Sequence, residues 1–244
     1  MRATLSKVTL DTRSHDMRLP RENAVDFAIQ RANMVESQVR PSDVTDRRII
    51  RAMRDVPREK FVPERVRGLA YMDGSVPLSP PQGAGKRSLL AARVFAKLVQ
   101  AAEIDATGVV LDIGAGSGYS SAVLAQLAGR VVALESDSAL AASARELLPS
   151  VGCTTVSVVE GDLAQGWAVE GPYDAIVVEG AIEVVPEALF DQLKDGGRLV
   201  AISGRGAGRA TVWQREGRSF GAAEVFDASG DVLPGFEKPA AFTF

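Results

Sequence analysis

Three glycines at alternating positions follow a short apolar run near the middle of the sequence. The run is Val109–Ile113, and Gly114, Gly116 and Gly118 come directly after it. Such a run suits a buried parallel strand, and residues 120–127 beyond the glycines have helical character. A glycine-rich turn between a strand and a helix lets a ligand approach the main chain and the N–H groups that begin the helix. The pattern therefore predicts a ligand site at this turn.

The spacing of the glycines narrows the class of ligand. A dinucleotide-binding turn requires the pattern G-x-G-x-x-G, but Tyr119 stands where the third glycine of that pattern would be. With Asp112 in the strand before it, the turn resembles that of S-adenosylmethionine-dependent methyltransferases. Because many α/β proteins use a glycine-rich turn only for packing, the cofactor S-adenosyl-L-methionine needs further support from the sequence.

Acidic residues at two later positions supply that support. Residues 130–134 predict a second strand with Glu135 at its end, and residues 154–159 predict a third strand that leads to Asp162. An acidic residue roughly 20 positions past the glycines is where Rossmann-like sheets hold a ribose diol. Asp162 would lie over the same crevice and accept from an adenine amino group. Either acid alone is equally well explained as a helix cap, but together with the glycines they favour a nucleoside site.

The composition excludes several other kinds of site. The 244 residues carry a net charge of −3, which argues against binding nucleic acids or membranes through bulk charge. No apolar run reaches the roughly 18 residues of a membrane span. A single histidine, His15, leaves no basis for a histidine metal site or a Ser-His-Asp triad, so we expect no metal. The single cysteine, Cys153, suits a reducing, cytoplasmic compartment.

This lack of common catalytic groups suits methyl transfer. In methyl transfer from a sulfonium the cofactor carries the reactive chemistry, and the protein mainly aligns the acceptor and excludes water. A carboxylate acceptor is already ionised at neutral pH and needs no general base.

We expect three parts along the chain. They are an irregular N-terminal arm (1–24), an N-terminal helical extension with a substrate loop (25–105), and a Rossmann-like cofactor-binding core with a C-terminal hairpin (106–244). In the second part, Thr45 is the predicted N-cap of a helix with an apolar face that ends before Pro57. In the third part, we expect a helix over 186–193 that stops at the glycines 196–197, then a strand over 198–202 and a hairpin over 210–226.

The order of these pieces resembles the protein-L-isoaspartate O-methyltransferases from Met34 to Ile202. The strings that carry the likeness are 34–40, 50–63 and 70–73 in the N-terminal part and 111–119, 160–162, 172–177 and 193–200 in the core. The resemblance implies an α/β, Rossmann-like S-adenosylmethionine methyltransferase fold, with a mixed seven-stranded sheet, helices on both faces and an N-terminal helical extension. It also implies a transferase that esterifies isoaspartyl carboxylates in damaged proteins, which begins their repair.

The resemblance also assigns the cofactor site. It places Gly114, Gly116 and Gly118 against the methionine part of S-adenosyl-L-methionine and Glu135 against its ribose. It places Asp162 and Leu163 against the adenine, and Asp112 belongs to the same site.

The chain departs from the family in the loop expected to cover the cofactor and hold the substrate. Family members follow Leu-Pro with Gly-x-Gly-Gln-Thr-Ile-Ser-x-Pro. Here Gln82 keeps its place, but Gly83 stands at the threonine and Gly85 at the serine. Losing a hydroxyl donor to a bound carboxylate typically costs about 1.5–3 kcal/mol. The loop candidates for catalysis that remain are Ser79, Gln82 and Ser88.

The cationic residues of this loop have two interpretations. Lys86 and Arg87 either contact a substrate carboxylate or face solvent. Three hypotheses for the whole chain stay open: an isoaspartyl methyltransferase, a diverged member with another acceptor, and a cofactor-binding protein without turnover. An RNA methyltransferase is less favoured, because the net charge is negative and no aromatic-rich acceptor motif is present. The sequence leaves the oligomeric state open.

Overall fold

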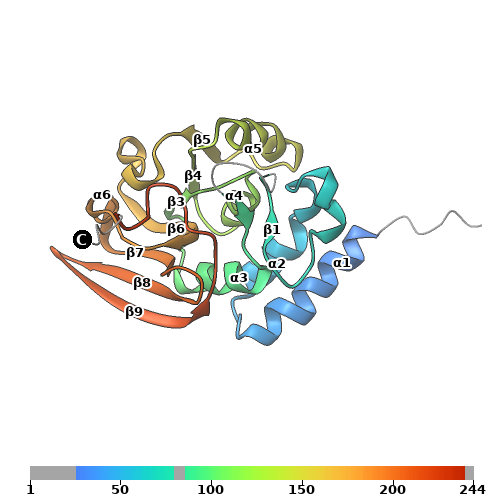
Figure 1. Cartoon of the computed structure of the whole chain (residues 1–244), viewed down its shortest axis with the longest axis horizontal. Coiled ribbons are helices and arrows are strands. Elements are labelled where there is room, and N and C mark those ends of the chain that lie inside the picture. The colour runs from blue at the N-terminus through green and yellow to red at the C-terminus, as the bar shows by residue number, and fades with distance from the viewer. Residues whose placement is uncertain (1–25, 80–85, 240–244) are drawn as a thin grey trace, which may run out of the picture.

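A seven-stranded sheet crosses the computed structural model, which describes residues 26–79 and 86–239 (Figure 1). The strand order is β5-β4-β3-β6-β7-β8-β9. Neighbouring strands from β5 to β7 are parallel, whereas the β7–β8 and β8–β9 pairs are antiparallel. The sheet is therefore mixed, as the sequence predicted.

Most strands match apolar runs of the sequence. The strands of the large sheet are β3 (Val109–Ile113), β4 (Arg130–Glu135), β5 (Val156–Glu160), β6 (Tyr173–Ile182), β7 (Leu193–Ser203), β8 (Gly208–Glu216) and β9 (Ser219–Ala228). A separate antiparallel pair consists of β1 (Val76–Pro77) and β2 (Ser88–Leu89). The central parallel strands are buried on both faces, which explains why they read as unbroken apolar runs.

Helices cover both faces of the sheet. The α-helices of the described residues are α1 (Phe27–Met34), α2 (Arg47–Asp55), α3 (Ala92–Ala101), α4 (Tyr119–Leu124), α5 (Ser138–Ser150) and α6 (Glu187–Asp191). Shorter turns are the π-helical Val35–Val39 and the 3-10 segments Arg40–Ser42, Arg58–Lys60, Glu64–Leu69, Leu163–Gln165 and Ala168–Glu170. In Figure 1, α1 to α3 lie together on one side, and α5 lies beside β4 and β5.

The alternation of side chains along the strands divides the core in two. On one face, Val110 of β3 and Val177 of β6 pack with residues of α2, α3 and α4. On the other face, Leu111 and Ile176 pack with Leu189 of α6 and with the C-terminal segment. Because successive residues of a strand point to opposite faces, one apolar run supplies both cores.

Two local expectations from the sequence are wrong. The N-cap of α2 is Asp46, whose carboxylate accepts from the backbone N–H of Arg48 at 2.8 Å, and not Thr45. The glycines at 196–197 lie inside β7 and not at the end of a helix, because β7 already begins at Leu193. Its pairing with β6 is irregular there, and the φ of +76° at Gly196 accommodates the extra residues.

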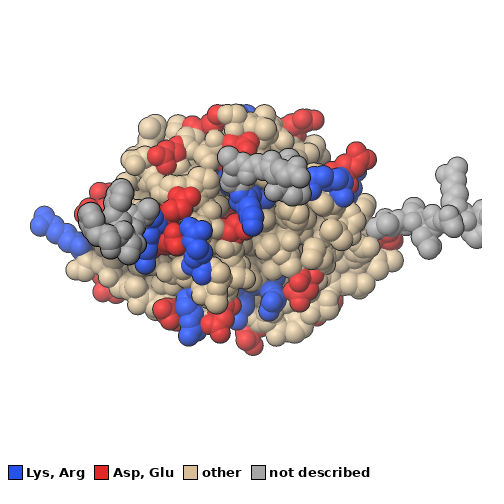
Figure 2. Space-filling view, viewed as in Figure 1, with Lys and Arg blue, Asp and Glu red and all other residues tan. Residues whose placement is uncertain are grey.

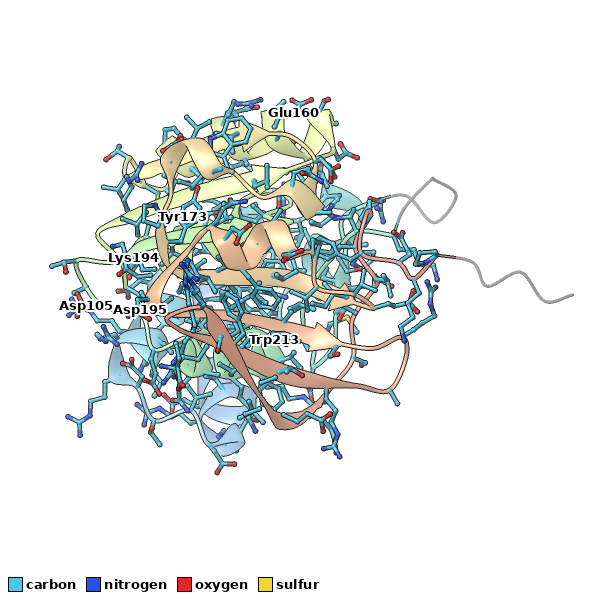
Figure 3. The ribbon with its side chains drawn as sticks, turned by 90° about the vertical axis from the view of Figure 1, so that its left-hand side faces the viewer. Asp105, Glu160, Tyr173, Lys194, Asp195 and Trp213 are labelled. Atoms are coloured by element: carbon cyan, nitrogen blue, oxygen red, sulfur yellow. The ribbon has the colours of Figure 1, made fainter. Side chains whose placement is uncertain are left out.

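The two ends of the parallel strands differ in their side chains. Figure 3 shows Asp105, Tyr173, Lys194 and Asp195 gathered at the end where these strands begin. There the Nζ of Lys194 lies 2.7 Å from a carboxylate oxygen of Asp174, so this end is an ion-paired surface. The glycines 114, 116 and 118 and the acids Glu135 and Asp162 follow the opposite, carboxyl ends of the strands, where open α/β sheets bind ligands.

The charged surface is mixed in sign. Figure 2 shows Lys and Arg side chains interspersed with Asp and Glu on the face that it displays. Across residues 26–79 and 86–239, no helix is both long and apolar enough to cross a membrane. The same part of the chain contains no group of three His, Cys, Asp or Glu side chains arranged to hold a metal ion.

Candidate functional site

Gly114, Gly116 and Gly118 form the tight turn that was predicted, between β3 and α4. Their φ angles are +77° at Gly114, +58° at Gly116 and +98° at Gly118, a region that disfavours side chains. A Cβ on Gly118 would also lie 3.3 Å from the Cβ of Ala144 in α5. The backbone N–H of Gly114 donates to the carbonyl of Leu134 at 2.8 Å, which ties the turn to β4. Glycine at these positions is thus required by backbone conformation and close packing.

Glu135 is buried at the end of β4 and accepts hydrogen bonds from the glycine turn. Its Oε2 atom accepts from the backbone N–H of Gly116 at 2.7 Å and from the guanidinium of Arg87. Its Oε1 atom accepts from the backbone N–H groups of Ser136 at 2.8 Å and Asp137 at 2.9 Å. The structure therefore brings Glu135 and the glycines together, as the sequence predicted.

Asp112 lies beneath the turn, in the middle of the sheet. Its Oδ2 atom accepts from the hydroxyls of Ser120 at 2.7 Å and Ser121 at 2.6 Å, which fastens α4 to β3. Its Oδ1 atom is buried and has no hydrogen-bond partner among the described residues. Burial raises the pKa of Asp112 to about 6, although the two hydroxyls act in the opposite direction.

Asp162 and Leu163 lie on the neighbouring strand end. The backbone N–H of Gly161 donates to the carbonyl of Glu135 at 3.1 Å, which places this segment beside the end of β4. The carboxylate of Asp162 accepts from the N–H of Ala164 at 2.9 Å and caps the 3-10 segment in which Leu163 is buried. Asp162 is thus a cap, and its predicted contact with adenine stays a prediction.

Side chains from distant segments pack against the glycine turn. A Cβ on Gly114 would meet Leu233 at 2.8 Å and Arg87 at 3.2 Å, and a Cβ on Gly116 would meet Leu78 at 2.7 Å. Arg87 is only 5% exposed. The expectation that Arg87 either binds a substrate carboxylate or faces solvent is therefore incomplete, because its partner is a carboxylate of the protein itself.

Two further polar residues near the turn, Arg58 and Glu179, were missed from the sequence. Arg58 is buried and donates to the carbonyls of Ala70 and Leu90, both at 2.8 Å, while its guanidinium lies 4.6 Å from the ring centroid of Tyr119. Glu179 follows the apolar run of β6, and its Oε1 atom is buried without a hydrogen-bond partner among the described residues. Burial, and then the nearby Asp112, raises the pKa of Glu179 well above its ordinary value.

Signals for both residues were present in the sequence. Arg58 falls within the family-like string 50–63, and Glu179 is an acidic residue at the end of an apolar strand. The second is the same signal that identified Glu135.

The loop candidates are only partly described. The hydroxyl of Ser88, in β2, donates to a carboxylate oxygen of Asp231 at 2.9 Å. The backbone N–H of Ser79 donates to the carbonyl of Arg87 at 3.3 Å. Gln82, like Gly83 and Gly85, lies outside the described residues. Neither Ser79 nor Ser88 has a hydrogen bond to Glu135 or Asp112, and their catalytic role stays a prediction.

The comparisons with known proteins agree on one family. The family model described as "Protein-L-isoaspartate(D-aspartate) O-methyltransferase" matches residues 30–222. A protein-L-isoaspartate O-methyltransferase 1 of Rhodopseudomonas palustris (strain HaA2) is 43% identical over 179 residues, which are 73% of this chain and 71% of that protein. A protein-L-isoaspartate O-methyltransferase of Methanoculleus marisnigri is 42% identical over 175 residues, which are 72% of this chain and 77% of that protein.

Solved structures share the fold. A structure named protein-L-isoaspartate O-methyltransferase matches with a TM-score of 0.75 and 23% identity, over 84% of this chain and 66% of that one. A Plasmodium falciparum protein described as a putative member of the family, in complex with S-adenosyl-L-homocysteine, matches with a TM-score of 0.66 and 19% identity, over 83% and 97% of the two chains. These matches confirm the predicted Rossmann-like methyltransferase fold. The chain therefore belongs to the protein-L-isoaspartate(D-aspartate) O-methyltransferase family, a family of S-adenosylmethionine-dependent methyltransferases.

Proposed function

We propose that the protein transfers a methyl group from S-adenosyl-L-methionine to the carboxylate of isoaspartyl residues in damaged proteins. The observation that carries this proposal is the buried carboxylate of Glu135 beside the backbone N–H of Gly116, at the carboxyl end of the parallel strands. The adenosyl ligand of the Plasmodium falciparum relative, S-adenosyl-L-homocysteine, supports a cofactor of the same chemistry here.

The residues around the turn fit an adenosyl cofactor in type. Glu135 is an ionisable acceptor suited to ribose hydroxyls, and the glycines expose the main chain to the methionine part. Asp162 and Leu163 offer a polar and an apolar contact for adenine at the next strand end. Arg87 now contacts Glu135, so binding requires this side chain to move.

The chemical task left to the protein is mainly alignment. Bound S-adenosyl-L-methionine supplies a methyl group activated by its sulfonium. The chain's own residues hold the cofactor at the turn, orient the acceptor in line with the methyl carbon and exclude water. Because an isoaspartyl carboxylate is already ionised at neutral pH, no side chain needs to remove a proton from it.

A different acceptor is the main alternative, and the departures of the loop favour it. Gly83 and Gly85 remove two hydroxyls that family members offer to the substrate. Asp112, Glu135 and the partly buried Glu179 also place three acidic groups near the turn, which disfavours a further carboxylate when they are ionised. A cofactor-binding protein without turnover is the remaining alternative.

A methanol-release assay separates these functions. The purified protein is incubated with labelled S-adenosyl-L-methionine and a peptide containing isoaspartate, and base-labile methanol is measured. We expect release from this peptide and none from a peptide of the same sequence with ordinary aspartate. Cofactor binding with label on another acceptor would support the diverged enzyme, and binding without any labelled acceptor would support the protein without turnover.

A matched variant shows whether the signal comes from this site. Glu135→Gln keeps the shape of the side chain but removes its charge, and we expect at least a tenfold loss of cofactor affinity and of methanol release. Unchanged methanol release by a folded Glu135→Gln protein would show that methyl transfer does not depend on Glu135.

We also propose that residues 25–105 form the extension with its loop and residues 106–244 the core; the arm expected at residues 1–24 lies outside the described residues. The change from short helices to the large sheet near residue 106 supports this division. A cytoplasmic location is likewise a proposal, supported by the single cysteine.

A further inference from the structure

Arg87 contacts the one carboxylate of the site that is suited to a ribose diol. Its guanidinium is bonded to Oε2 of Glu135, and the two side chains are 5% and 0% exposed. We infer that Arg87 and the cofactor compete for Glu135, so that Arg87 sets the affinity of the protein for its cofactor. This inference rests on the proposed function, because Glu135 has this role only if the protein binds an adenosyl compound.

Hydrogen bonds hold the backbone of Arg87 in place, and its side chain points to the glycine turn. The carbonyl of Arg87 accepts from the N–H groups of Leu78 at 2.8 Å and Ser79 at 3.3 Å, next to the β1–β2 pairing. A Cβ added to Gly114 would lie 3.2 Å from the Nη2 atom of Arg87. Arg87 therefore lies against Gly114 as well as on Glu135.

The hydrogen-bond capacity of Glu135 makes this contact exclusive. An ionised carboxylate offers about four acceptor sites. Oε1 accepts from the N–H groups of Ser136 and Asp137, and Oε2 accepts from the N–H of Gly116 and from Arg87. Oε1 also accepts a long hydrogen bond from the hydroxyl of Ser136 at 3.5 Å. Gly116, Ser136 and Asp137 donate through backbone groups of the turns after β3 and β4, which the fold holds in place, so Arg87 is the one side-chain donor on Oε2. Arg87 is the donor that can leave, and ribose hydroxyls can bind only when it does.

Electrostatics explains why Arg87 occupies this place. Its guanidinium is a positive charge close to three acidic groups, the buried Asp112 and Glu135 and the partly buried Glu179. Breaking a buried ion pair by removing one partner is costly, because the other charge is left uncompensated. Because ribose hydroxyls bind only after Arg87 leaves, this ion pair must open each time that the cofactor binds. The free energy that opening costs lowers the observed affinity for the cofactor.

The test is a comparison of Arg87→Gln with Lys86→Gln. Both variants remove one positive charge from neighbouring positions, but Lys86 is exposed and Arg87 is buried. Calorimetry measures the affinity of each protein for S-adenosyl-L-homocysteine, which is neutral at the sulfur position, and for sinefungin, which carries an amine there. We expect Arg87→Gln to tighten both affinities by the same factor, about tenfold or more, and Lys86→Gln to change them less than twofold.

The outcomes distinguish competition from other roles of Arg87. A gain for sinefungin alone would show that Arg87 only repels a cationic ligand, and equal or weaker affinity for both would show that Arg87 does not compete; either result overturns the inference. If the unaltered protein binds S-adenosyl-L-homocysteine and Arg87→Gln shows no gain, only the inference fails. If none of the three proteins binds either compound, the proposed function fails with it.

A measurement on the unaltered protein covers the case in which the Arg87 variant does not fold. Phenylglyoxal modifies accessible arginine side chains, and mass spectrometry reports the rate at Arg87. Since Arg87 is buried on Glu135, we expect slow modification of the protein alone and faster modification with saturating S-adenosyl-L-homocysteine. An unchanged or slower rate at Arg87 with that ligand would contradict its displacement.

Discussion

A carboxyl group buried in a sheet resists ionisation, and Asp112 is such a group. Burial raises its pKa from 3.8 to about 6, so between these values the folded protein binds a proton that the unfolded chain has lost. Stability therefore falls as the pH rises through this window, and Asp112 costs on the order of 3 kcal/mol when it is fully ionised. We predict that Asp112→Asn reduces the fall in the free energy of unfolding between pH 4 and pH 7, measured by urea denaturation.

Asp105 provides the matched control for this prediction. It is exposed, and the hydroxyl of Thr107 lowers its pKa, so its contribution is present above its ordinary pKa and is lost only as the pH falls below about 4. Asp105→Asn should leave the dependence between pH 4 and pH 7 unchanged. An identical fall in Asp112→Asn and in the unaltered protein would show that Asp112 is not the group responsible.

Residues whose roles follow from local sequence could be predicted, and residues whose roles depend on the fold could not. Glycines at 114, 116 and 118 and the acid at 135 occupy fixed positions relative to their own strands, and the structure brings them together. The partner of Arg87 lies 48 residues further along the chain. Nothing in the loop sequence shows that this cation is buried, because its burial results from the packing of the loop against the end of the sheet.

At the level of elements, the start of α2 shows how a cap is chosen. Thr45 and Asp46 are both good N-cap residues, so the sequence alone does not decide between them. In the structure the backbone N–H of Thr45 donates to the side chain of Gln100 at 2.7 Å, and the same side-chain oxygen accepts from Asp46 at 3.1 Å. This contact with α3 fixes the chain so that the Asp46 carboxylate reaches the N–H of Arg48.

We predict that Asp46→Ala destabilises the protein by about 1 kcal/mol through loss of this cap. Thr45→Ala should cost less, because the hydrogen bond of Thr45 to Gln100 comes mainly from its backbone. Urea denaturation of the two variants at neutral pH measures the difference. A larger loss of stability in Thr45→Ala than in Asp46→Ala would show that Thr45, and not Asp46, is the N-cap.

The irregularity in β7 illustrates a second limit at this scale. Lys194 and the glycines at 196–197 read as a helix terminus followed by a turn, since glycine is common in both places. Pairing with β6 begins earlier, at Tyr173 and Leu193, and resumes at Ala175 and Arg198. The extra residues between these pairs are accommodated only because a neighbouring strand exists, and the local sequence does not contain that information.

For the whole molecule, the pattern of apolar runs determined most of the architecture. The parallel strands β3, β4 and β6 are buried on both faces, so their sequences are continuously apolar and easy to identify. The hairpin of β8 and β9 was also identified, although β9 is largely exposed at the edge of the sheet. The arrangement of the strands in one mixed sheet came from the family resemblance and not from these runs, because strand order depends on contacts between distant segments.

A ligand that binds only the folded chain stabilises the molecule as a whole. At one hundred times its dissociation constant, S-adenosyl-L-homocysteine should add about 2.7 kcal/mol to the free energy of unfolding. For a chain of this size, that corresponds to a rise in Tm of roughly 5–10 °C. The same concentration of NAD, which also carries an adenosine ribose, should produce little change, because Tyr119 stands at the third glycine of a dinucleotide-binding turn.

Equal shifts with the two compounds, measured by differential scanning calorimetry, would contradict the assignment of this turn to an adenosyl methionine compound. A shift with S-adenosyl-L-homocysteine that persists in Glu135→Gln would show that the stabilising contact lies away from the end of β4.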